Sequence, residues 1–153
     1  MRYWLMKSEP ESFSIDRLAG LPEQTTSWDG VRNYQARNYM RDDMKDGDMV
    51  LFYHSNCDEP GVVGLAKVKG VPYPDFTAFD SSSKYYDPKS DPDNPRWIMV
   101  DVQLVRKFSS TVTLKRIKSD DRLKDMMLTQ KGSRLSVQPV SEKEYEIVLS
   151  MEE

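Results

Sequence analysis

The hydrophobic pattern of the chain consists mainly of short apolar runs separated by turn residues. Residues 3–6 are apolar on both faces, as in a strand of a closed or covered sheet. The runs at 49–53 and 61–71 are rich in residues that favour strands and flank a turn region, so they predict a hairpin. Strict alternation over 98–104 predicts a strand with two distinct faces, and 134–137 is the last predicted strand.

Helical signals fall between these strands. Ser14 is positioned to cap a short helix that runs through Leu18 and ends at Gly20. Residues 33–44 carry apolar side chains at four-residue spacing, which predicts an amphipathic helix. Further short helices are predicted over 114–119, 121–127 and 142–150, and a Ser-x-x-Glu capping box opens the last of them.

A long segment without regular pattern covers residues 72–96. It is rich in proline and aspartate, and loops of this length inside compact domains are usually functional or disordered. Its aromatic side chains favour an ordered flap, because disordered segments are poor in them.

These elements predict a single domain over residues 1–153. Hydrophobic residues make up 38% and charged residues 31% of the chain, which is the composition of a folded soluble protein rather than a disordered one. Strands punctuated by short helices and one large flap suit an α+β fold. We expect a small mixed β-barrel of about five to six strands with the short helices packed around it.

Charge and cysteine content exclude several classes of protein. A net charge of −3 argues against a protein that holds long duplexes mainly by neutralising phosphates. No signal peptide is visible and no apolar run approaches the roughly 18 residues of a membrane helix, so we expect no membrane partner and a cytoplasmic location, or a nuclear one in a eukaryote. With Cys57 as the single cysteine and His54 as the single histidine, we expect no internal disulfide, no metal and no cofactor.

Six segments of the sequence carry a recognisable set of motifs. They are YWLMKSEP at 3–10, WDGVRNYQARN at 28–38, GDMVLFYHSN at 47–56, PGVVG at 60–64, YYDPK at 85–89 and GSRLSVQP at 132–139. Together they resemble the EVE family closely, in the order of that family and over nearly the whole chain. Any one of these segments alone is a weak signal, whereas the combination is specific.

The resemblance implies a fold and a class of ligand. EVE domains are PUA-like barrels related to YTH domains, which read a methylated adenine in an aromatic cage. The resemblance also implies a pocket for a modified base, and methylated or hydroxymethylated cytosine is the ligand proposed for some EVE members. An extruded base is a flat π-system with hydrogen-bonding groups on its edge, so its pocket needs aromatic faces and a few fixed polar groups.

Four aromatic side chains are candidates for stacking on such a base. Trp28 is expected in a turn before the amphipathic helix, and ordinary core packing is the alternative role. Tyr85 and Tyr86 lie on the flap, where they could close over the base or anchor the flap to the body. Trp97 is the weakest candidate, since it could simply cover the outside of its strand.

Polar candidates for the edge of the base lie at predicted strand ends and near a helix start. They are Lys7, Ser8, Glu9, Asp29, Asn33, His54, Ser55 and Asn56. Where a strand ends, backbone groups leave the sheet ladder and can bond a ligand. An ordinary turn at the end of the first strand, a helix cap at Asn33 and a structural histidine at His54 are the alternatives.

Basic residues could contact the phosphates on either side of the base. The candidates are Arg37, Arg41 and Lys45 on one stripe of the predicted helix, with Lys84, Lys89 and Arg134 elsewhere. A solvated face is the alternative meaning of that stripe. The expected partner is a nucleic acid with a modified base, single-stranded or flipped because opening a base pair costs a few kcal/mol. We expect the chain to act as a monomer.

Enzymatic interpretations and a protein-interaction module compete with this one. Cys57 lies three residues from His54, but side chains three apart on an extended strand point to opposite faces, so a cysteine nucleophile is disfavoured. A ribonuclease in the manner of the related ASCH domains would use Lys7, His54 and a tyrosine. A protein-interaction module would use the flap. The favoured interpretation is a non-enzymatic binder in which Trp28 and a flap tyrosine sandwich the base.

Overall fold

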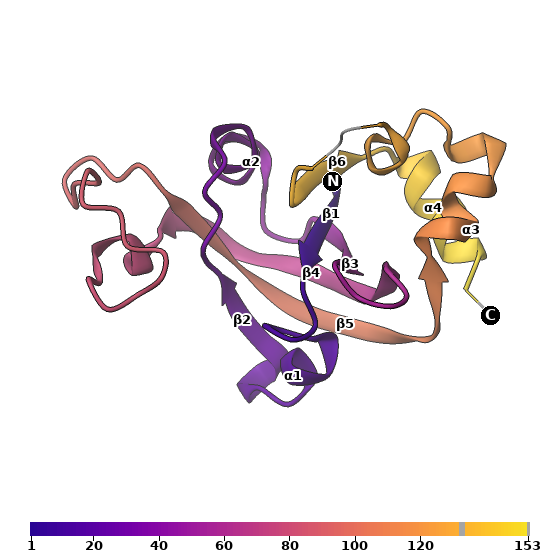
Figure 1. Cartoon of the computed structure of the whole chain (residues 1–153), viewed down its shortest axis with the longest axis horizontal. Helices are drawn as coiled ribbons and strands as arrows, with labels where there is room; N and C mark the ends of the chain where they lie inside the picture. The colour runs from indigo at the N-terminus through magenta and orange to yellow at the C-terminus, as the bar shows by residue number, and fades with distance from the viewer. Residues whose placement is uncertain (132–133, 153) are drawn as a thin grey trace.

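The computed structural model describes residues 1–131 and 134–152. It contains a six-stranded mixed sheet in the order β2-β5-β4-β3-β1-β6, with short helices around it (Figure 1). The strands are β1 Tyr3–Ser8, β2 Thr25–Trp28, β3 Met49–His54, β4 Gly61–Pro74, β5 Ile98–Thr113 and β6 Val137–Val140. Gly132 and Ser133 of the EVE-like segment 132–139, and Glu153 at the end of the expected domain, lie outside the described residues.

Strand pairing brings together segments that are far apart in the sequence. β1 pairs in parallel with β3 and antiparallel with β6. The predicted hairpin between β3 and β4 is confirmed, and β4 pairs along its length with β5 to form a long antiparallel ribbon. β2 pairs with β5 on the other side of that ribbon. The flap and the C-terminal helices lie at opposite ends of the ribbon (Figure 1).

The helices are short and begin at recognisable caps. They are α1 Ile15–Ala19, α2 Tyr34–Asn38, α3 Leu114–Ser119 and α4 Glu142–Ser150, with the 3₁₀ turns η1 Pro22–Gln24, η3 Phe76–Phe79, η4 Asp121–Leu123 and η5 Met127–Thr129 and the π turn η2 Tyr39–Asp43. The predicted cap at Ser14 and the capping box at α4 are both present. None of the helices in the described part of the chain has the length and apolar character to cross a bilayer.

Buried side chains lie on both faces of the sheet. The first core takes side chains from all six strands, among them Trp4, Trp28 and Phe52, and adds residues of α1 and α2. Each strand therefore contributes side chains to the same face of the sheet. The second core lies between the other face and the C-terminal helices, where Leu5 and Leu51 meet residues of α3 and α4. The mixed α+β, PUA-like fold expected from the sequence is confirmed.

The sequence prediction is wrong for several strand boundaries. Trp28 is not in a turn but ends β2, a strand whose Thr-Thr-Ser-Trp sequence shows no apolar alternation. β5 continues to Thr113 rather than stopping at Leu104, because register shifts against β4 interrupt the alternation. β6 begins at Val137 and continues through Pro139, which an edge strand tolerates because one side of its backbone needs no ladder partner.

The helices predicted over 114–119 and 142–150 are confirmed with those bounds, whereas two other predicted helices are longer than the observed ones. The segment 33–44 is divided into α2 and the π turn η2, and 121–127 is two 3₁₀ turns instead of one helix. Met126 separates these turns with an extended backbone (φ −63°, ψ 135°), and its side chain is buried in the second core. The flap starts at Asp75 rather than residue 72, since β4 extends to Pro74.

Candidate functional site

A cleft of about 710 Å³, called here the first cleft, opens between the end of β1, the loop after β2 and the flap (residues 75–97). The predicted site residues that line it are Lys7, Ser8, Glu9, Trp28, Asp29, Ser55, Lys84, Tyr85 and Arg134. Sequence reasoning did not single out several other lining residues, among them Ser12, Phe13, Arg17, Gly30 and Arg32. The first cleft therefore collects side chains from five separated segments of the chain.

Trp28 forms part of the wall from the end of β2. Its indole packs edge-on against Phe52 with ring centroids 5.5 Å apart, and only 8% of the residue is exposed. Most of the side chain thus belongs to the first core, and its cleft-facing part is held rigidly by that packing. Trp28 therefore packs in the first core and lines the first cleft at the same time.

Tyr85 enters the first cleft from the flap and rests on the backbone of Gly30. Gly30 has a φ of +76°, and a Cβ placed there would lie 2.5 Å from Cζ of the tyrosine ring. A residue with a side chain at position 30 would therefore displace the ring, in addition to the strain of its left-handed backbone. The ammonium group of Lys84 lies 5.0 Å from the ring centroid. Gly30 belongs to the EVE-like segment at 28–38, but its role depends on a contact that only the fold creates.

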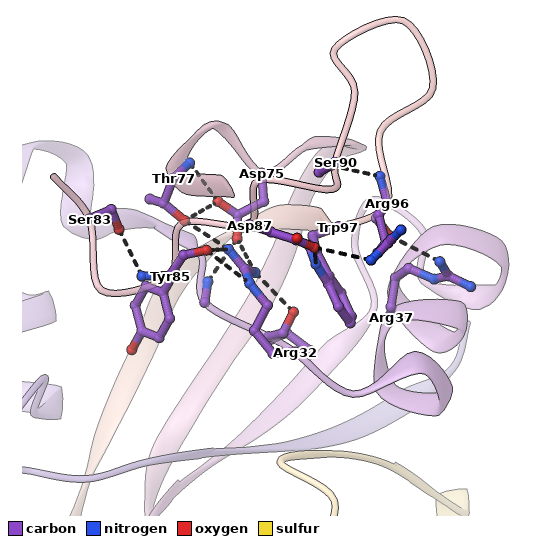
Figure 2. A network of polar contacts seen from close by, with 12 residues as sticks. Arg32, Arg37, Asp75, Thr77, Ser83, Tyr85, Asp87, Ser90, Arg96 and Trp97 are labelled. Carbon is purple, nitrogen blue, oxygen red and sulfur yellow. Dashed lines mark hydrogen bonds and ion pairs between the residues drawn. The ribbon is translucent and has the colours of Figure 1, made fainter. Parts of the chain in front are cut away.

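Arg32 fixes the flap to the body of the protein (Figure 2). Its guanidinium group donates two hydrogen bonds to the carbonyl oxygen of Tyr85, at 3.2 and 2.7 Å, and one to Oγ1 of Thr77 at 3.2 Å. It also pairs with the buried carboxylate of Asp75 at 3.0 Å. The planar guanidinium can satisfy these acceptors together because its donors form a fixed fork.

Asp75 is the centre of this network and is fully buried. Burial opposes ionisation, but hydrogen bonds from the Thr77 hydroxyl, the Gly30 amide and the Arg32 guanidinium outweigh it and hold the pKa of Asp75 below its usual range. The amide of Gly30 donates to Oδ2 at 2.8 Å. Asp75 thereby joins the start of the flap to the loop after β2, and both segments supply lining residues of the first cleft.

Trp97 anchors the other end of the flap and does not line the first cleft. Its indole N–H donates to Asp87 at 2.7 Å, and this bond is the main cause of the lowered pKa of that carboxyl group. The ring stacks on Tyr34 of α2, with centroids 5.0 Å apart, and lies against the Arg32 guanidinium at 5.3 Å. Arg37 donates to the carbonyl oxygen of Arg96 at 3.0 Å (Figure 2). These contacts hold the flap in a defined position.

The ends of β1 and β3 are joined at the edge of the first cleft. The amide of Ser55 donates to the carbonyl oxygen of Ser8 at 3.0 Å, and the Ser8 hydroxyl donates to the carbonyl oxygen of Phe13 at 2.6 Å. The Glu9 carboxylate accepts from Nδ2 of Asn56 at 2.9 Å, and its carbonyl oxygen accepts from the amide of Phe13. The backbone oxygens expected to be free at the end of β1 thus already accept hydrogen bonds within the protein.

The ionisable groups at the rim have shifted pKa values. Partial burial lowers the pKa of Lys7, whose amide donates to the carbonyl oxygen of Ser136 at 2.8 Å. Although Asp29 is an exposed residue, partial desolvation and the neighbouring carboxylate of Asp75 raise its pKa.

The remaining predicted residues lie outside the lining of the first cleft. They are Asn33, Arg37, Arg41, Lys45, His54, Asn56, Tyr86, Lys89 and Trp97. Asn33 caps α2, where its Oδ1 accepts a backbone N–H at 3.0 Å. His54 accepts the Ile15 amide on Nε2 at 3.1 Å, and Arg41 pairs with its exposed neighbour Asp42. Asn33, His54 and Arg41 therefore have structural roles, which are the alternatives to ligand binding considered for them from the sequence.

Within residues 1–131 and 134–152, no group of three or more His, Cys, Asp or Glu side chains is arranged to hold a metal ion. The chemistry available in the first cleft is that of aromatic faces, hydroxyl groups, carboxylates and basic side chains. Such a set can stack on a flat ligand, bond its edge and attract an anion.

Comparison with known proteins gives the family. The family model described as EVE domain matches residues 2–151. The chain belongs to the EVE family. One relative of this EVE chain, human thymocyte nuclear protein 1, is 49% identical over 168 residues, which cover 99% of this chain and 74% of the human protein.

Solved structures resemble the whole EVE chain. The structure of the human THYN1 protein in complex with 5-methylcytosine containing DNA has a TM-score of 0.94 at 48% identity and covers 100% of this chain and 98% of that chain. A mutant ASCH protein from Zymomonas mobilis has a TM-score of 0.59 at 11% identity, with full coverage of both chains. This second likeness shows a shared fold alone.

Proposed function

We propose that this EVE domain binds nucleic acid that carries a modified base and holds that base in the first cleft, against Trp28 and Tyr85. The observation that carries the proposal is the similarity over the whole chain to the human THYN1 protein, whose structure is a complex with DNA containing 5-methylcytosine. We therefore assign a methylated or hydroxymethylated cytosine as the ligand class. Because that complex contains DNA, DNA is the first partner to test.

The lining of the first cleft supports a flat aromatic ligand. Its volume of about 710 Å³ lies within the range of about 300–1,000 Å³ typical of ligand pockets. Phe13, Trp28 and Tyr85 supply apolar faces, and Ser8 and Ser55 supply hydroxyl groups for a base edge. Stacking contributes about 1–3 kcal/mol per base.

Selectivity for a modification needs more than contact with a methyl group. Burying one methyl contributes about 0.8 kcal/mol, which is roughly fourfold in affinity because about 1.4 kcal/mol is tenfold. A larger preference requires that the plain base leave a void, or that a hydroxymethyl group find its own hydrogen bond. A measured preference above fourfold therefore indicates a pocket shaped for the modification.

Basic side chains in the first cleft support contact with phosphates despite the net charge of −3. Lys7, Arg17, Lys84 and Arg134 all line it. Arg134 and Lys84 were expected in this role, whereas Arg37, Arg41 and Lys89 lie elsewhere and are not part of the proposal. A few local cations suit a module that binds one short stretch of nucleic acid.

We assign a binding role without catalysis. The thiol of Cys57 donates to the carbonyl oxygen of His54 at 3.9 Å, so it faces the backbone and not the imidazole. The imidazole itself accepts the Ile15 amide. Burial raises the pKa of Tyr53 to about 12, which makes its phenol a poor base at neutral pH. A time course with labelled RNA checks this assignment, since a ribonuclease shortens the strand and a binder leaves it intact.

The proposal also includes the state of the bound base, the oligomeric state and the cellular location. A single-stranded or flipped base binds best, because a paired base must first be extruded at a cost of a few kcal/mol. We also expect the domain to act as a monomer. Cytoplasmic or nuclear nucleic acid is the target that we expect.

The test is a binding titration of labelled single-stranded DNA that carries one cytosine, 5-methylcytosine or 5-hydroxymethylcytosine. Tyr85→Ala is the informative variant, because the hydrogen bonds of Arg32 to the backbone carbonyl of Tyr85 do not depend on the ring, although the guanidinium also lies 5.4 Å from the ring centroid. We expect a loss of about 1–3 kcal/mol, or roughly 5- to 150-fold in affinity. Trp28→Ala is less informative, since truncating a core indole costs about 3–5 kcal/mol of stability.

The matched control is Tyr86→Ala. Tyr86 is the neighbouring residue on the flap, is 44% exposed and does not line the first cleft. The Tyr86→Ala variant should bind the labelled DNA with the affinity of the wild type. Equal and weak binding of all three DNA molecules by the wild-type protein would overturn the proposal. Binding of a protein partner that survives nuclease treatment and Tyr85→Ala would favour the protein-interaction alternative.

A further inference from the structure

A second cleft, of about 610 Å³, lies beside the first and has a different lining. Its basic residues are Lys7, Lys118, Lys124 and Lys131, and the other lining residues are Tyr53, Leu114, Leu128, Thr129 and Gln130. The second cleft thus combines an apolar and hydroxyl-bearing floor with a set of lysines. Sequence reasoning assigned no role to Lys118, Lys124 or Lys131.

The lysines of the second cleft form a single-sign field. Among the residues that the structure describes, no acidic side chain lines it. Asp120, the acidic residue nearest to Lys118 in sequence, is hydrogen-bonded to the Arg122 guanidinium at 2.7 Å. A cleft lined by one sign of charge with low-dielectric walls concentrates the potential and attracts counter-ions. In a chain of net charge −3, four lysines give the lining of the second cleft a local positive charge, while the exposed Asp121 and Asp125 of the same segment lie outside that lining.

These lysines are available to a ligand. Lys118, Lys124 and Lys131 are exposed. Among residues 1–131 and 134–152, their ammonium groups have no ion-pair partner. The loop that carries two of them is ordered by its own hydrogen bonds, since Nε2 of Gln130 donates to the carbonyl oxygen of Lys124 at 2.6 Å. An anion therefore meets cations on a preformed loop.

Lys7 joins the two clefts around the end of the sheet. It lines both of them. Its ammonium group lies 5.8 Å from the ring centroid of Tyr53, the residue opposite it on β3. Neighbouring residues on a strand point to opposite faces. Met6 accordingly packs in the first core, while Lys7 lies over Tyr53, which belongs to the second core. Lys7 is therefore the residue that the two linings share.

We infer that the second cleft holds the phosphodiester backbone of the nucleic-acid strand whose modified base occupies the first cleft. Lys118, Lys124 and Lys131 neutralise phosphates on one side of the base, and Lys7 marks the passage between the two clefts. The leucines and Tyr53 provide an apolar floor for sugars or an unstacked base. This inference rests on the proposed function for the position of the base, but not for the attraction of the backbone.

The test removes the three lysines together. A Lys118→Gln, Lys124→Gln, Lys131→Gln variant is compared with a Lys67→Gln, Lys69→Gln, Lys143→Gln variant, which loses the same charge from exposed residues outside both clefts. Binding of single-stranded DNA of about twelve nucleotides with a central 5-methylcytosine is measured over a series of salt concentrations. A trinucleotide with the same base serves as the short ligand.

The cleft variant should bind the long DNA about tenfold or more weakly at low salt. The slope of log affinity against log salt should fall by about 0.7 for each lost phosphate contact, so by about 2 in all. The preference for 5-methylcytosine and the binding of the trinucleotide should not change, since both depend on the first cleft. The control variant should lose less affinity and keep a slope near that of the wild type.

The outcomes separate the two proposals. A cleft variant with the affinity and salt slope of the control overturns the backbone path, whatever the base preference. If the wild type shows no base preference but the cleft variant still loses the salt-dependent affinity, the backbone path stands and the proposed base pocket fails. If the wild-type protein binds no DNA at any salt concentration, both are overturned.

Discussion

A missing Cβ decides where the Tyr85 ring lies. Gly30 combines a left-handed backbone, φ +76°, with a tyrosine ring in the space that a Cβ would occupy. Gly47 has a similar backbone, φ +88°, but open space where a Cβ would be. Alanine substitutions at Gly30 and Gly47 can therefore be compared to separate the cost of backbone strain from the cost of displacing the Tyr85 ring.

Gly30→Ala should reduce both stability and binding. The left-handed conformation alone costs a residue with a Cβ about 1–2 kcal/mol, which is also the expected cost of Gly47→Ala. Gly30→Ala should cost more than this, because its methyl group would overlap the ring of Tyr85. Urea unfolding measures the stability, and DNA titration measures the affinity. Equal effects of the two variants would mean that the ring moves aside without cost.

His54 should make stability depend on pH in the weakly acidic range. Its Nε2 accepts the Ile15 amide, and burial lowers its pKa in the folded protein. The unfolded chain, with a pKa near 6.5, therefore binds more protons just below that pH, so stability is complete above about 6.5 and is lost as pH falls through the lower folded value. His54→Gln should keep an acceptor for the amide and remove this dependence.

The measurement is the midpoint of thermal unfolding between about pH 7.5 and 5.5, above the range in which most carboxylates titrate. His54 is the single histidine of the chain, so the difference between wild type and variant reports on one imidazole. A difference that stays constant over this range would contradict the expected role of the imidazole as a neutral acceptor.

Individual site residues could be predicted where they belong to a recognisable segment. Trp28 and Tyr85 lie in EVE-like segments and both line the first cleft. Arg32 belongs to the same segment as Trp28 but was not assigned a role, because its main partners, Asp75 and Tyr85, are 43 and 53 residues away. A partner at that separation leaves no local signal in the sequence.

At the scale of elements, the flap is a long loop held by polar contacts at both ends. Arg32 holds its middle and Asp75 its start, while Trp97 and Asp87 hold its end. Local opening of such a segment is governed by these few buried interactions, because it contributes few residues to either core. The contact between Tyr85 and Gly30 therefore depends on the same network.

Arg32→Lys should loosen the flap. A lysine keeps the charge beside Asp75 but cannot donate together to the carbonyl oxygen of Tyr85 and to Thr77. Leaving buried acceptors unpaired costs about 1–3 kcal/mol. Each 1.4 kcal/mol raises the open population about tenfold. Trypsin cleavage after Lys84 or Lys89, followed by mass spectrometry, should accelerate accordingly.

The control for this prediction is Arg41→Lys. Arg41 pairs with its exposed sequence neighbour Asp42 and does not touch the flap through any hydrogen bond or ion pair that involves the described residues. Trypsin should cleave the flap of the Arg41→Lys variant at the same rate as that of the wild type. Equal rates for both variants would mean that other contacts hold the flap.

Element boundaries show where pattern reasoning works and where it stops. β1, β3 and the capped helix α4 were predicted because apolar runs and caps are local signals. β2 was missed because its side chains up to Trp28 are polar, and pairing with β5 creates the strand. The second half of β5 was missed because its register shifts break the alternation on which the prediction rests.

At the scale of the whole molecule, the sequence predicted the fold class and the family but not the second cleft. Its lysines come from the end of β1, from α3 and from the loop around η5, so their sequence positions suggest no common site. The order of the strands brings them together, since β1 pairs with β3 and the C-terminal segment covers the outer face of both. The composition gives a net charge of −3, and this value does not reveal that lysines gather in one cleft.

The two cores should unfold together because β5 contributes to both. Val102 is fully buried in the first core and Val112 is fully buried in the second. Val→Ala at either position should reduce the free energy of unfolding by about 1.6 kcal/mol or more, from two lost methyl groups at about 0.8 kcal/mol each and the cavity that remains. Tryptophan fluorescence reports mainly on the first core, through Trp4 and Trp28, and circular dichroism includes the helices on the second.

If the ribbon of β4 and β5 couples the cores, each variant shifts both signals by the same amount and the transitions stay coincident. Val112→Ala is the more demanding case, because it perturbs the core without tryptophan and must still move the fluorescence transition. Separate transitions would instead mean that the C-terminal helices open while the first core stays folded. The second cleft, which those helices help to form, would then be lost under conditions that preserve the first.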